Sequence, residues 1–433
     1  MGQSRKEKWI DQGFFVVLLL TVSVLTLLLF HWQTIGSTEH YHSDMKAYIL
    51  EMQGLDSGYS FPYPVFFKFS AMIHLFAGPE FSVALATMLL NSLGMVCMKL
   101  CLDHYVLGDL RDALPGRKWL AGVLVSLVSV SLFFISMLFP PKGIYLPGIK
   151  YNYLGVFTSN PFHNATYMAA RPFAIMAFFQ YVKLLPCYEQ GYVGKESAAG
   201  GVALKDYVLF ALFLLLATMT KPSFTIVLVG TAGLIMLYRL LRSGFRNFLP
   251  TLKLGLCFLP TFADLLYQYQ GVFVPKEGAE GGIGFCFGRI WGLYCDNLPL
   301  AVCLAVGFPL LVLVLHLKEM KTDTLYRFSW QVYAMSFAMA FFLYEKGFRA
   351  PDFNFSWGYM YGIFFSFVGA VILLLRDTAV YLKVQGERKD WKESRKKSQK
   401  AGLLLALQWA AYLCHLGCGL YYFWGIFRGN MYY

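Results

Sequence analysis

The sequence of 433 residues is poor in charge and rich in apolar side chains. Charged residues make up 14% of it and hydrophobic residues 57%, whereas soluble globular domains carry about 25% charge. A water-soluble core cannot bury that much apolar surface. The shortage of charge therefore excludes a soluble domain. It predicts an all-α fold, a polytopic integral membrane helix bundle that forms one domain over residues 1–433.

Other features are missing as well. No soluble nucleotide-binding fold is visible, and no internal repeat supports a transporter of the inverted-repeat type. The nine cysteines have no metal-binding spacing. Cys286 and Cys295 share one predicted outer loop and could pair on an oxidising side of the membrane. Spacing alone does not fix such a pairing.

Apolar runs that approach or reach the roughly 17 to 25 residues needed to cross a bilayer recur along the whole chain. We place eleven spans, at residues 13–30, 81–102, 120–139, 172–185, 207–220, 222–240, 254–269, 298–317, 328–344, 358–375 and 403–427. The weakest division lies at Lys221-Pro222, where the two segments could also form one long kinked helix.

The distribution of basic residues orients these spans, because cytoplasmic loops collect Lys and Arg. With an inner N-terminus, 26 of the 37 Lys and Arg fall on the inner side and 11 on the outer side. A single helix over 207–240 would move the nine cations of the basic loop 376–402 outside. We therefore predict two spans there, and a multi-pass cell-membrane protein with a cytoplasmic N-terminus, a cytoplasmic loop 376–402 and an outer C-terminus.

The first outer loop, residues 31–80, contains two features of interest. Its apolar segment 64–76 has only 13 residues, too few to span, so we predict a helix that lies in the membrane interface. Before it, His42 and Asp44 stand just outside the first span. An acid at the water-facing mouth of a helix bundle is a functional hypothesis. Asp44 is therefore our candidate catalytic base and His42 its neighbour, although a solvated carboxylate and a loop-orienting histidine are the simpler interpretations.

Later segments bring further polar and aromatic residues to the same predicted side. We predict that they bind substrate: His163, Asn164, Arg171, Lys221, Arg349 and Trp357. Lys221 stands before a proline break between two short apolar segments, a costly place for a cation unless it faces water or an anion. Arg171 could instead be a snorkelling arginine at a helix end, and Trp357 a residue of the interfacial belt.

These motifs resemble a known family. The segments Asn160-Pro161-Phe162-His163-Asn164-Ala165-Thr166-Tyr167, Arg171-Pro172-Phe173 and Lys221-Pro222-Ser223-Phe224, with the first-loop Asp44, look like bacterial C-type membrane glycosyltransferases. That superfamily uses polyprenyl-phosphate sugars and includes protein O-mannosyltransferases and lipid A aminoarabinose transferases. The resemblance implies an inverting transfer at the outer face, with Asp44 as general base and Lys221, Arg171 or Arg349 holding the lipid phosphate. The family often has an acidic pair in this loop. Here His42 precedes a lone Asp44, so the residues do not support a divalent metal.

The predicted function is therefore the transfer of a sugar from a polyprenyl-phosphate-linked donor to an acceptor hydroxyl. The expected partners are the lipid-linked donor and membrane lipids, with no nucleic acid. The sequence establishes no further cofactor, leaves a divalent metal open without supporting it, and names no protein partner. The alternatives are a transporter or flippase, or a polymerase, for a lipid-linked glycan. A transporter would spread ionisable residues through the membrane depth, whereas this sequence is expected to concentrate them at the outer mouth. The sequence leaves the sugar, the acceptor and the oligomeric state open.

Overall fold

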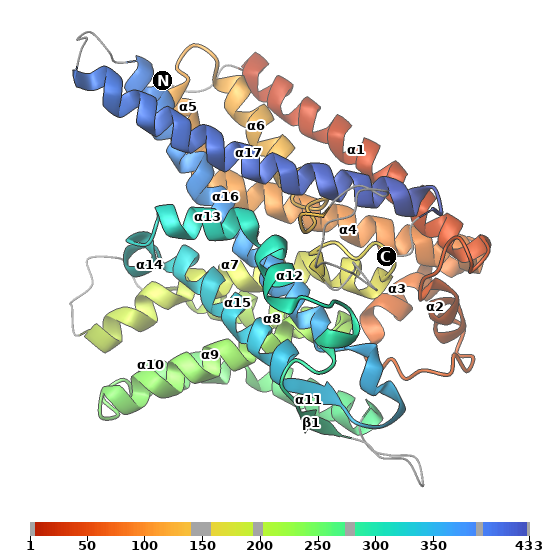
Figure 1. Ribbon diagram of the computed structural model, residues 1–433. Coiled ribbons are helices and arrows are strands. Elements are labelled where there is room, and N and C mark those ends of the chain that lie inside the picture. The colour runs from red at the N-terminus through yellow and green to blue at the C-terminus, as the bar shows by residue number, and fades with distance from the viewer. Residues whose placement is uncertain (1–4, 140–156, 194–201, 273–281, 387–392, 431–433) are drawn as a thin grey trace.

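The computed structural model describes residues 5–139, 157–193, 202–272, 282–386 and 393–430, and these ranges are almost entirely helical (Figure 1). The helices are α1 (Arg5–Ile35), α2 (Met45–Met52), α3 (Pro64–His74), α4 (Pro79–Leu102), α5 (Gly108–Ala113), α6 (Lys118–Ser131), α7 (Ala165–Val193), α8 (Leu204–Thr220), α9 (Ser223–Arg242), α10 (Phe248–Leu256), α11 (Leu259–Val272), α12 (Leu298–Ala305), α13 (Gly307–Leu315), α14 (Glu319–Thr322), α15 (Thr324–Phe342), α16 (Ser356–Gly386) and α17 (Glu393–Phe427). A π-helical turn, Asp103–Leu107, joins α4 to α5.

Within the described ranges, five helical stretches are long and apolar enough to cross a membrane: α1, α4 continued through α5, α9, α16 and α17. Two bent pairs, α10 with α11 and α12 with α13, raise that number to seven if each pair is one span. The other expected spans fall on α6, α7, α8 and α15, which are shorter or less apolar. The chain is thus a helical membrane protein with five to seven candidate spans, and the count of eleven stays a prediction.

The two ends of the bundle differ in their chemistry. We call the end with α2, α3 and the ribbon of strands β1 (Ile283–Phe285) and β2 (Leu343–Glu345) the loop end. The end with α14 and the turns 103–118 and 243–248 is the basic end. In Figure 1, α17 begins at the upper left, beside the N-terminus, and ends on the right, where the C-terminus and α3 lie. The ion pairs that tie helices together gather at the basic end. Glu189 binds both Arg239 and Arg327 at 2.7 Å, and Asp323 binds Arg376 at 2.6 Å.

The division at Lys221-Pro222 is real in the structure. Helix α8 ends at Thr220, Lys221 is extended, and α9 begins at Ser223. The segment therefore forms two helices and not one kinked helix, because proline supplies no N–H to continue α8. The hydroxyls of Thr218 and Thr225, 2.9 Å apart, join the two helices beside the break.

The third expected span differs from the structure. Residues 120–139 were expected to form one helix, but α6 ends at Ser131 and the chain continues as a buried irregular segment, Leu132–Phe139. Irregular backbone survives inside a bundle only when its polar groups find partners within the protein. His415 of α17 supplies two of them here. Its carbonyl accepts from the Ser136 N–H at 3.3 Å, and its ring nitrogen Nδ1 lies 2.7 Å from the Ser136 carbonyl.

The expected interfacial helix is present as α3. Phe66, Phe67 and Ser70 are buried against the bundle, whereas Leu75 and Phe76, just past the helix, are 76% and 89% exposed. One side of this segment therefore packs against the protein and its end presents bare apolar surface. That pattern suits a helix at a membrane surface, whose depth in the membrane stays a prediction.

A small two-stranded ribbon departs from the expected all-helical fold. Strand β1 (Ile283–Phe285) pairs antiparallel with β2 (Leu343–Glu345), with Gly284 opposite Tyr344. Helix α15 therefore ends at Phe342, and the expected span 328–344 finishes as a strand. Cys286 and Cys295, which follow β1, are free thiols in the structure.

Helix α16 is the centre of the bundle, since the apolar window of its span is wholly buried. Two glycines on α16 allow α15 to approach closely. A Cβ atom at Gly362 would overlap the Ser336 hydroxyl, and a Cβ atom at Gly369 would overlap that of Ser329. Both serine hydroxyls already donate to carbonyls of α15, so neither can turn away without losing a hydrogen bond.

We expect Gly362→Ala to lower the stability of the bundle by about 1 to 3 kcal/mol, the usual cost of overfilling a packed interior. Gly386→Ala at the end of α16 is the matched control, because no atom lies within 4 Å of its added methyl group. The unfolding midpoints of both variants in detergent provide the measurement. Equal midpoints would contradict the close packing of α15 on α16.

Candidate functional site

Asp44 stands at the start of α2 but does not cap it. An aspartate at an N-cap usually accepts a hydrogen bond from the first turn of its helix, whereas the Asp44 carboxylate makes no such bond. Its Oδ2 atom instead accepts from the Asn164 amide at 2.6 Å and from the Tyr48 hydroxyl at 3.2 Å. Among the described residues no group donates to Oδ1. The half-buried carboxylate is therefore held through one oxygen, and the other remains open to accept a proton.

The partner segment of Asp44 is fixed inside the bundle. Asn160 donates to the carbonyls of Ile135 and Leu132 at 2.7 and 3.2 Å, so the segment before α7 is tied to the irregular stretch Leu132–Phe139. Arg171, one turn into α7, donates to the Ser159 carbonyl at 2.8 Å. These bonds hold Asn164 rigid. Its amide oxygen in turn accepts from the Tyr167 N–H at 2.9 Å, at the start of α7.

A chain of hydrogen bonds joins Lys221 to Asp44. The Lys221 ammonium donates to the Thr166 hydroxyl at 3.2 Å, and this hydroxyl donates to the Asn164 amide oxygen at 3.0 Å. The Asn164 amide nitrogen donates in turn to the Asp44 carboxylate. The Thr166 hydroxyl oxygen also lies 3.2 Å from that of Tyr48. Lys221 and Asp44, which are far apart in sequence, are thus connected without a direct ion pair between them.

Aromatic rings cover the cation. The Lys221 ammonium lies 4.7 Å from the centre of the Trp357 ring and 5.8 Å from that of Tyr63, both within the range of a cation–π interaction. The ring of His163 packs against that of Trp357, with the ring centres 5.7 Å apart. Trp357 is oriented by a 3.3 Å hydrogen bond from its indole N–H to Asn354. We call this group the Asp44 cluster: Asp44, Tyr48, Tyr63, His163, Asn164, Thr166, Lys221 and Trp357.

The structure brings most of the predicted site residues together, although they are far apart in sequence. Asp44, His163, Asn164, Lys221 and Trp357 belong to the cluster through the contacts above. His42 is exposed beside it, near enough for its charge to act on His163. The side chain of Arg349 lies outside the described residues.

Arg171 occupies a different place from the rest. It is 1% exposed, and its guanidinium lies 5.1 to 5.7 Å from the ring centres of Phe133, Tyr167 and Phe364. Its contacts are therefore with the core and with the Ser159 carbonyl. This arrangement makes Arg171 a residue that positions the segment before α7.

Sequence reasoning missed Tyr48 and gave Thr166 no role. A signal for Tyr48 was present, because a residue four positions after Asp44 lies on the same face of a helix. Thr166 had no such signal, since its link to Lys221 depends on how α7 packs against the α8–α9 break. Among the described residues, no three His, Cys, Asp or Glu side chains gather closely enough to hold a metal ion.

Known proteins add no evidence to this geometry. No protein-family model, curated protein or solved structure matches the chain. Any assignment of function therefore depends on the cluster itself and on the resemblance of its motifs.

Burial lowers the pKa of His163 from 6.5 to about 4, an effect that Asp44 opposes and that His42 and Lys221 reinforce. His163 is thus neutral at physiological pH in the folded chain. The unfolded chain takes up a proton near pH 6.5, but the folded chain does so only near pH 4. The contribution of His163 to the free energy of unfolding is therefore fully present above pH 6.5 and is lost as the pH falls from there towards 4.

We expect this loss to be on the order of 1 to 3 kcal/mol, since one pKa unit corresponds to about 1.4 kcal/mol. Unfolding midpoints measured in detergent between pH 7 and pH 4 test it. His163→Gln should flatten this part of the pH dependence, whereas His104→Gln, at an exposed histidine of the basic end, should not. If the unfolding midpoint of His163→Gln falls with pH as steeply as that of the wild type, His163 does not cause the loss of stability.

Proposed function

We propose that this chain is a membrane glycosyltransferase that moves a sugar from a polyprenyl-phosphate donor to an acceptor hydroxyl at the outer face of the membrane. The observation that carries this proposal is the geometry of Asp44. The carboxylate is fixed through Oδ2 by Asn164 and Tyr48, and no described residue donates to Oδ1. An N-capping or ion-paired aspartate would not need this arrangement, whereas a general base does.

The proposed reaction uses the open oxygen of Asp44. The acceptor oxygen attacks the anomeric carbon of the sugar while Asp44 takes the hydroxyl proton, because a neutral hydroxyl is a weak nucleophile. The bond between that carbon and the phosphate oxygen breaks, and its electron pair leaves with polyprenyl phosphate. Attack opposite the leaving group inverts the anomeric centre.

Lys221 is suited to the other half of this reaction. The leaving phosphate gains negative charge, which a fixed cation in a dry site stabilises far better than water does. Lys221 is 6% exposed and is held by Thr166 and by the Trp357 ring. The hydrogen bonds through Thr166 and Asn164 connect the cation to the base within one cluster. Arg349 stays a second candidate for the phosphate.

The proposal includes the topology on which the site depends. We propose eleven spans in the cell membrane, with the basic end and the N-terminus in the cytoplasm and the loop end and the C-terminus outside. The basic residues of the sequence and the opposite placement of the termini (Figure 1) support this arrangement. Reporter fusions after Lys400 and at Tyr433 should report opposite sides of the membrane. A cytoplasmic signal at Tyr433 would rule this topology out.

Asp44→Asn is expected to abolish transfer while leaving folding and donor binding near those of the wild type. Asparagine keeps the shape of the side chain but cannot take a proton at neutral pH, and general-base catalysis is typically worth about 10² to 10⁴ in rate. The assay incubates the purified chain with a pool of polyprenyl-phosphate sugars and an acceptor mixture, and measures released polyprenyl phosphate.

Asp56→Asn is the matched control for this assay. Asp56 is an exposed acid of the same loop whose carboxylate accepts the Gly58 N–H at 2.9 Å. Its variant should keep full activity. Full activity of Asp44→Asn would remove Asp44 as the base. A transporter or flippase would give no released phosphate even from the wild type.

Lys221→Gln is expected to weaken donor binding. The loss of one charged hydrogen bond in a desolvated site costs about 1.5 to 3 kcal/mol, equivalent to roughly 10- to 150-fold in the dissociation constant. Lys68→Gln, at an exposed lysine of α3, serves as the control with the same charge change. Donor binding is measured with a fluorescent polyprenyl phosphate. Unchanged affinity in Lys221→Gln would place the phosphate elsewhere.

A further inference from the structure

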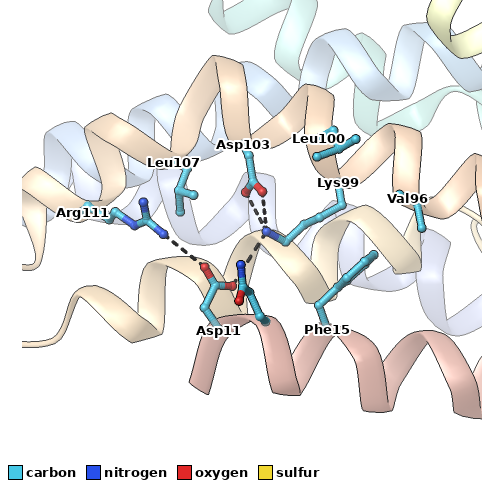
Figure 2. A pocket seen from close by; sticks show the side chains of 9 residues that line it. Asp11, Phe15, Val96, Lys99, Leu100, Asp103, Leu107 and Arg111 are labelled. Carbon is cyan, nitrogen blue, oxygen red and sulfur yellow. Dashed lines mark hydrogen bonds and ion pairs between the residues drawn. The ribbon is translucent and has the colours of Figure 1, made fainter. Parts of the chain in front are cut away.

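A second polar cluster lies at the basic end, away from the Asp44 cluster. A cavity of about 380 Å³ opens between α1, α4 and α5, and Figure 2 shows four ionisable side chains converging on it. Asp11 comes from α1, Lys99 from α4, Asp103 from the π-helical turn and Arg111 from α5. Nothing in the proposed transfer reaction uses these residues.

The cluster contains two positive and two negative groups. Lys99 donates to both oxygens of Asp103 at 2.6 and 2.7 Å, and its ammonium is 3.8 Å from Asp11 Oδ1. Arg111 donates to Asp11 Oδ2 at 3.1 Å. Because these charges balance, the cavity as a whole attracts neither an anion nor a cation. It is complementary to a ligand that carries both charges.

Two hydrogen-bonding positions remain unfilled among the described residues. The Asp11 side chain is only 9% exposed, yet its Oδ1 atom accepts no hydrogen bond. The buried Nε–H of Arg111 likewise has no acceptor. An unmade hydrogen bond at a buried polar atom costs about 1 to 3 kcal/mol. The cavity therefore lacks one donor beside Asp11 and one acceptor beside Arg111.

The surroundings of the cavity are those of a lipid site. Phe15, Val96 and Leu107 line it with apolar surface, and Leu100, which also lines it, is 61% exposed. Helices α1 and α4, which carry Phe15 and Leu100, are long and apolar enough to span a membrane. The polar groups therefore sit where an apolar, lipid-facing surface reaches the end of the bundle.

We propose that this cavity binds the headgroup of phosphatidylethanolamine from the adjoining leaflet. The ammonium of the headgroup supplies N–H donors to Asp11 and Asp103, and its phosphate accepts from Arg111 and Lys99. The acyl chains run along the exposed apolar faces of α1 and α4. In the proposed topology this is the cytoplasmic leaflet.

The charge pattern selects this lipid among those with a phosphate. Phosphatidylglycerol carries no amine, so it leaves Asp11 without a charged donor and brings a net negative charge to two carboxylates. The trimethylated amine of phosphatidylcholine has a positive charge but no N–H to donate. A site that leaves buried polar atoms unpaired discriminates strongly against the wrong ligand.

The test titrates the purified full-length chain in detergent with phosphatidylethanolamine, phosphatidylcholine or phosphatidylglycerol of identical acyl chains. Native mass spectrometry counts the bound lipid. We expect phosphatidylethanolamine to bind at least about tenfold more tightly than either competitor, the ratio set by one charged hydrogen bond. Equal affinities would mean that the four residues form only a structural ion-pair cluster, and tighter binding of phosphatidylglycerol would mean an unspecific basic surface. Either result overturns the proposal.

Two variants locate the preference. Arg111→Gln removes the phosphate partner and leaves the Lys99–Asp103 pair, so the preference for phosphatidylethanolamine should disappear. Arg117→Gln removes the same charge from an exposed arginine of the basic end that lies outside the cavity, so the preference should persist. Loss of the preference in both variants, or in neither, would refute the assignment to this cavity. Glycosyl transfer by Arg111→Gln under saturating donor is expected to stay unchanged, which separates this site from the proposed active site.

Discussion

The arrangement at the loop end depends on one constraint: backbone polar groups inside a bundle must find partners within the protein. Helix α6 stops at Ser131, a turn over residues 132–134 follows, and residues 135–139 form an irregular segment inside the bundle. Asn160 and His415 supply the missing partners. Because Asn160 belongs to the segment that leads into α7, the same bonds that satisfy the irregular backbone also fix where α7 begins. The position of Asn164, and through it that of Asp44, follows from this.

Charged side chains have different kinds of contact at the two ends of the bundle. At the basic end, arginines and lysines pair with carboxylates, as Arg327 and Arg239 do with Glu189. Such pairs neutralise one another and hold helices in place. At the loop end, by contrast, Lys221 contacts a hydroxyl and the faces of aromatic rings.

This contrast also bears on the choice between transfer and transport. Ionisable groups are not confined to the loop end, since a dense set lies at the basic end and Arg171 is buried near the start of α7. The expectation that they concentrate at the outer mouth was therefore too simple. Those at the basic end, however, are mostly engaged with one another, and Arg171 donates to the carbonyl of Ser159. We therefore keep the proposal of transfer at the Asp44 cluster.

The sequence by itself determined that the protein is a helical membrane bundle, and it pointed to several residues that the structure brings together. A charge content of 14% allows no soluble core, and the proline after Lys221 ends a helix because it has no N–H. Both are local properties of composition or of one residue, so no tertiary information was needed to predict a membrane bundle, the α8–α9 break or the helix expected at 64–76 and observed as α3.

Only the tertiary structure decided how these pieces meet. Nothing in the local sequence shows that α6 ends early at Ser131, that Arg171 turns into the core, or that a small strand follows α15. Nor does it show that Thr166 links Lys221 to Tyr48. Each of these results depends on which group packing places beside a polar atom. The bond from Lys221 to Thr166 joins residues 55 positions apart, and the contact of His415 with Ser136 joins residues 279 apart. The physical reason is that burial makes an unpaired polar group costly, and the partner that removes the cost is chosen by packing rather than by neighbours in sequence.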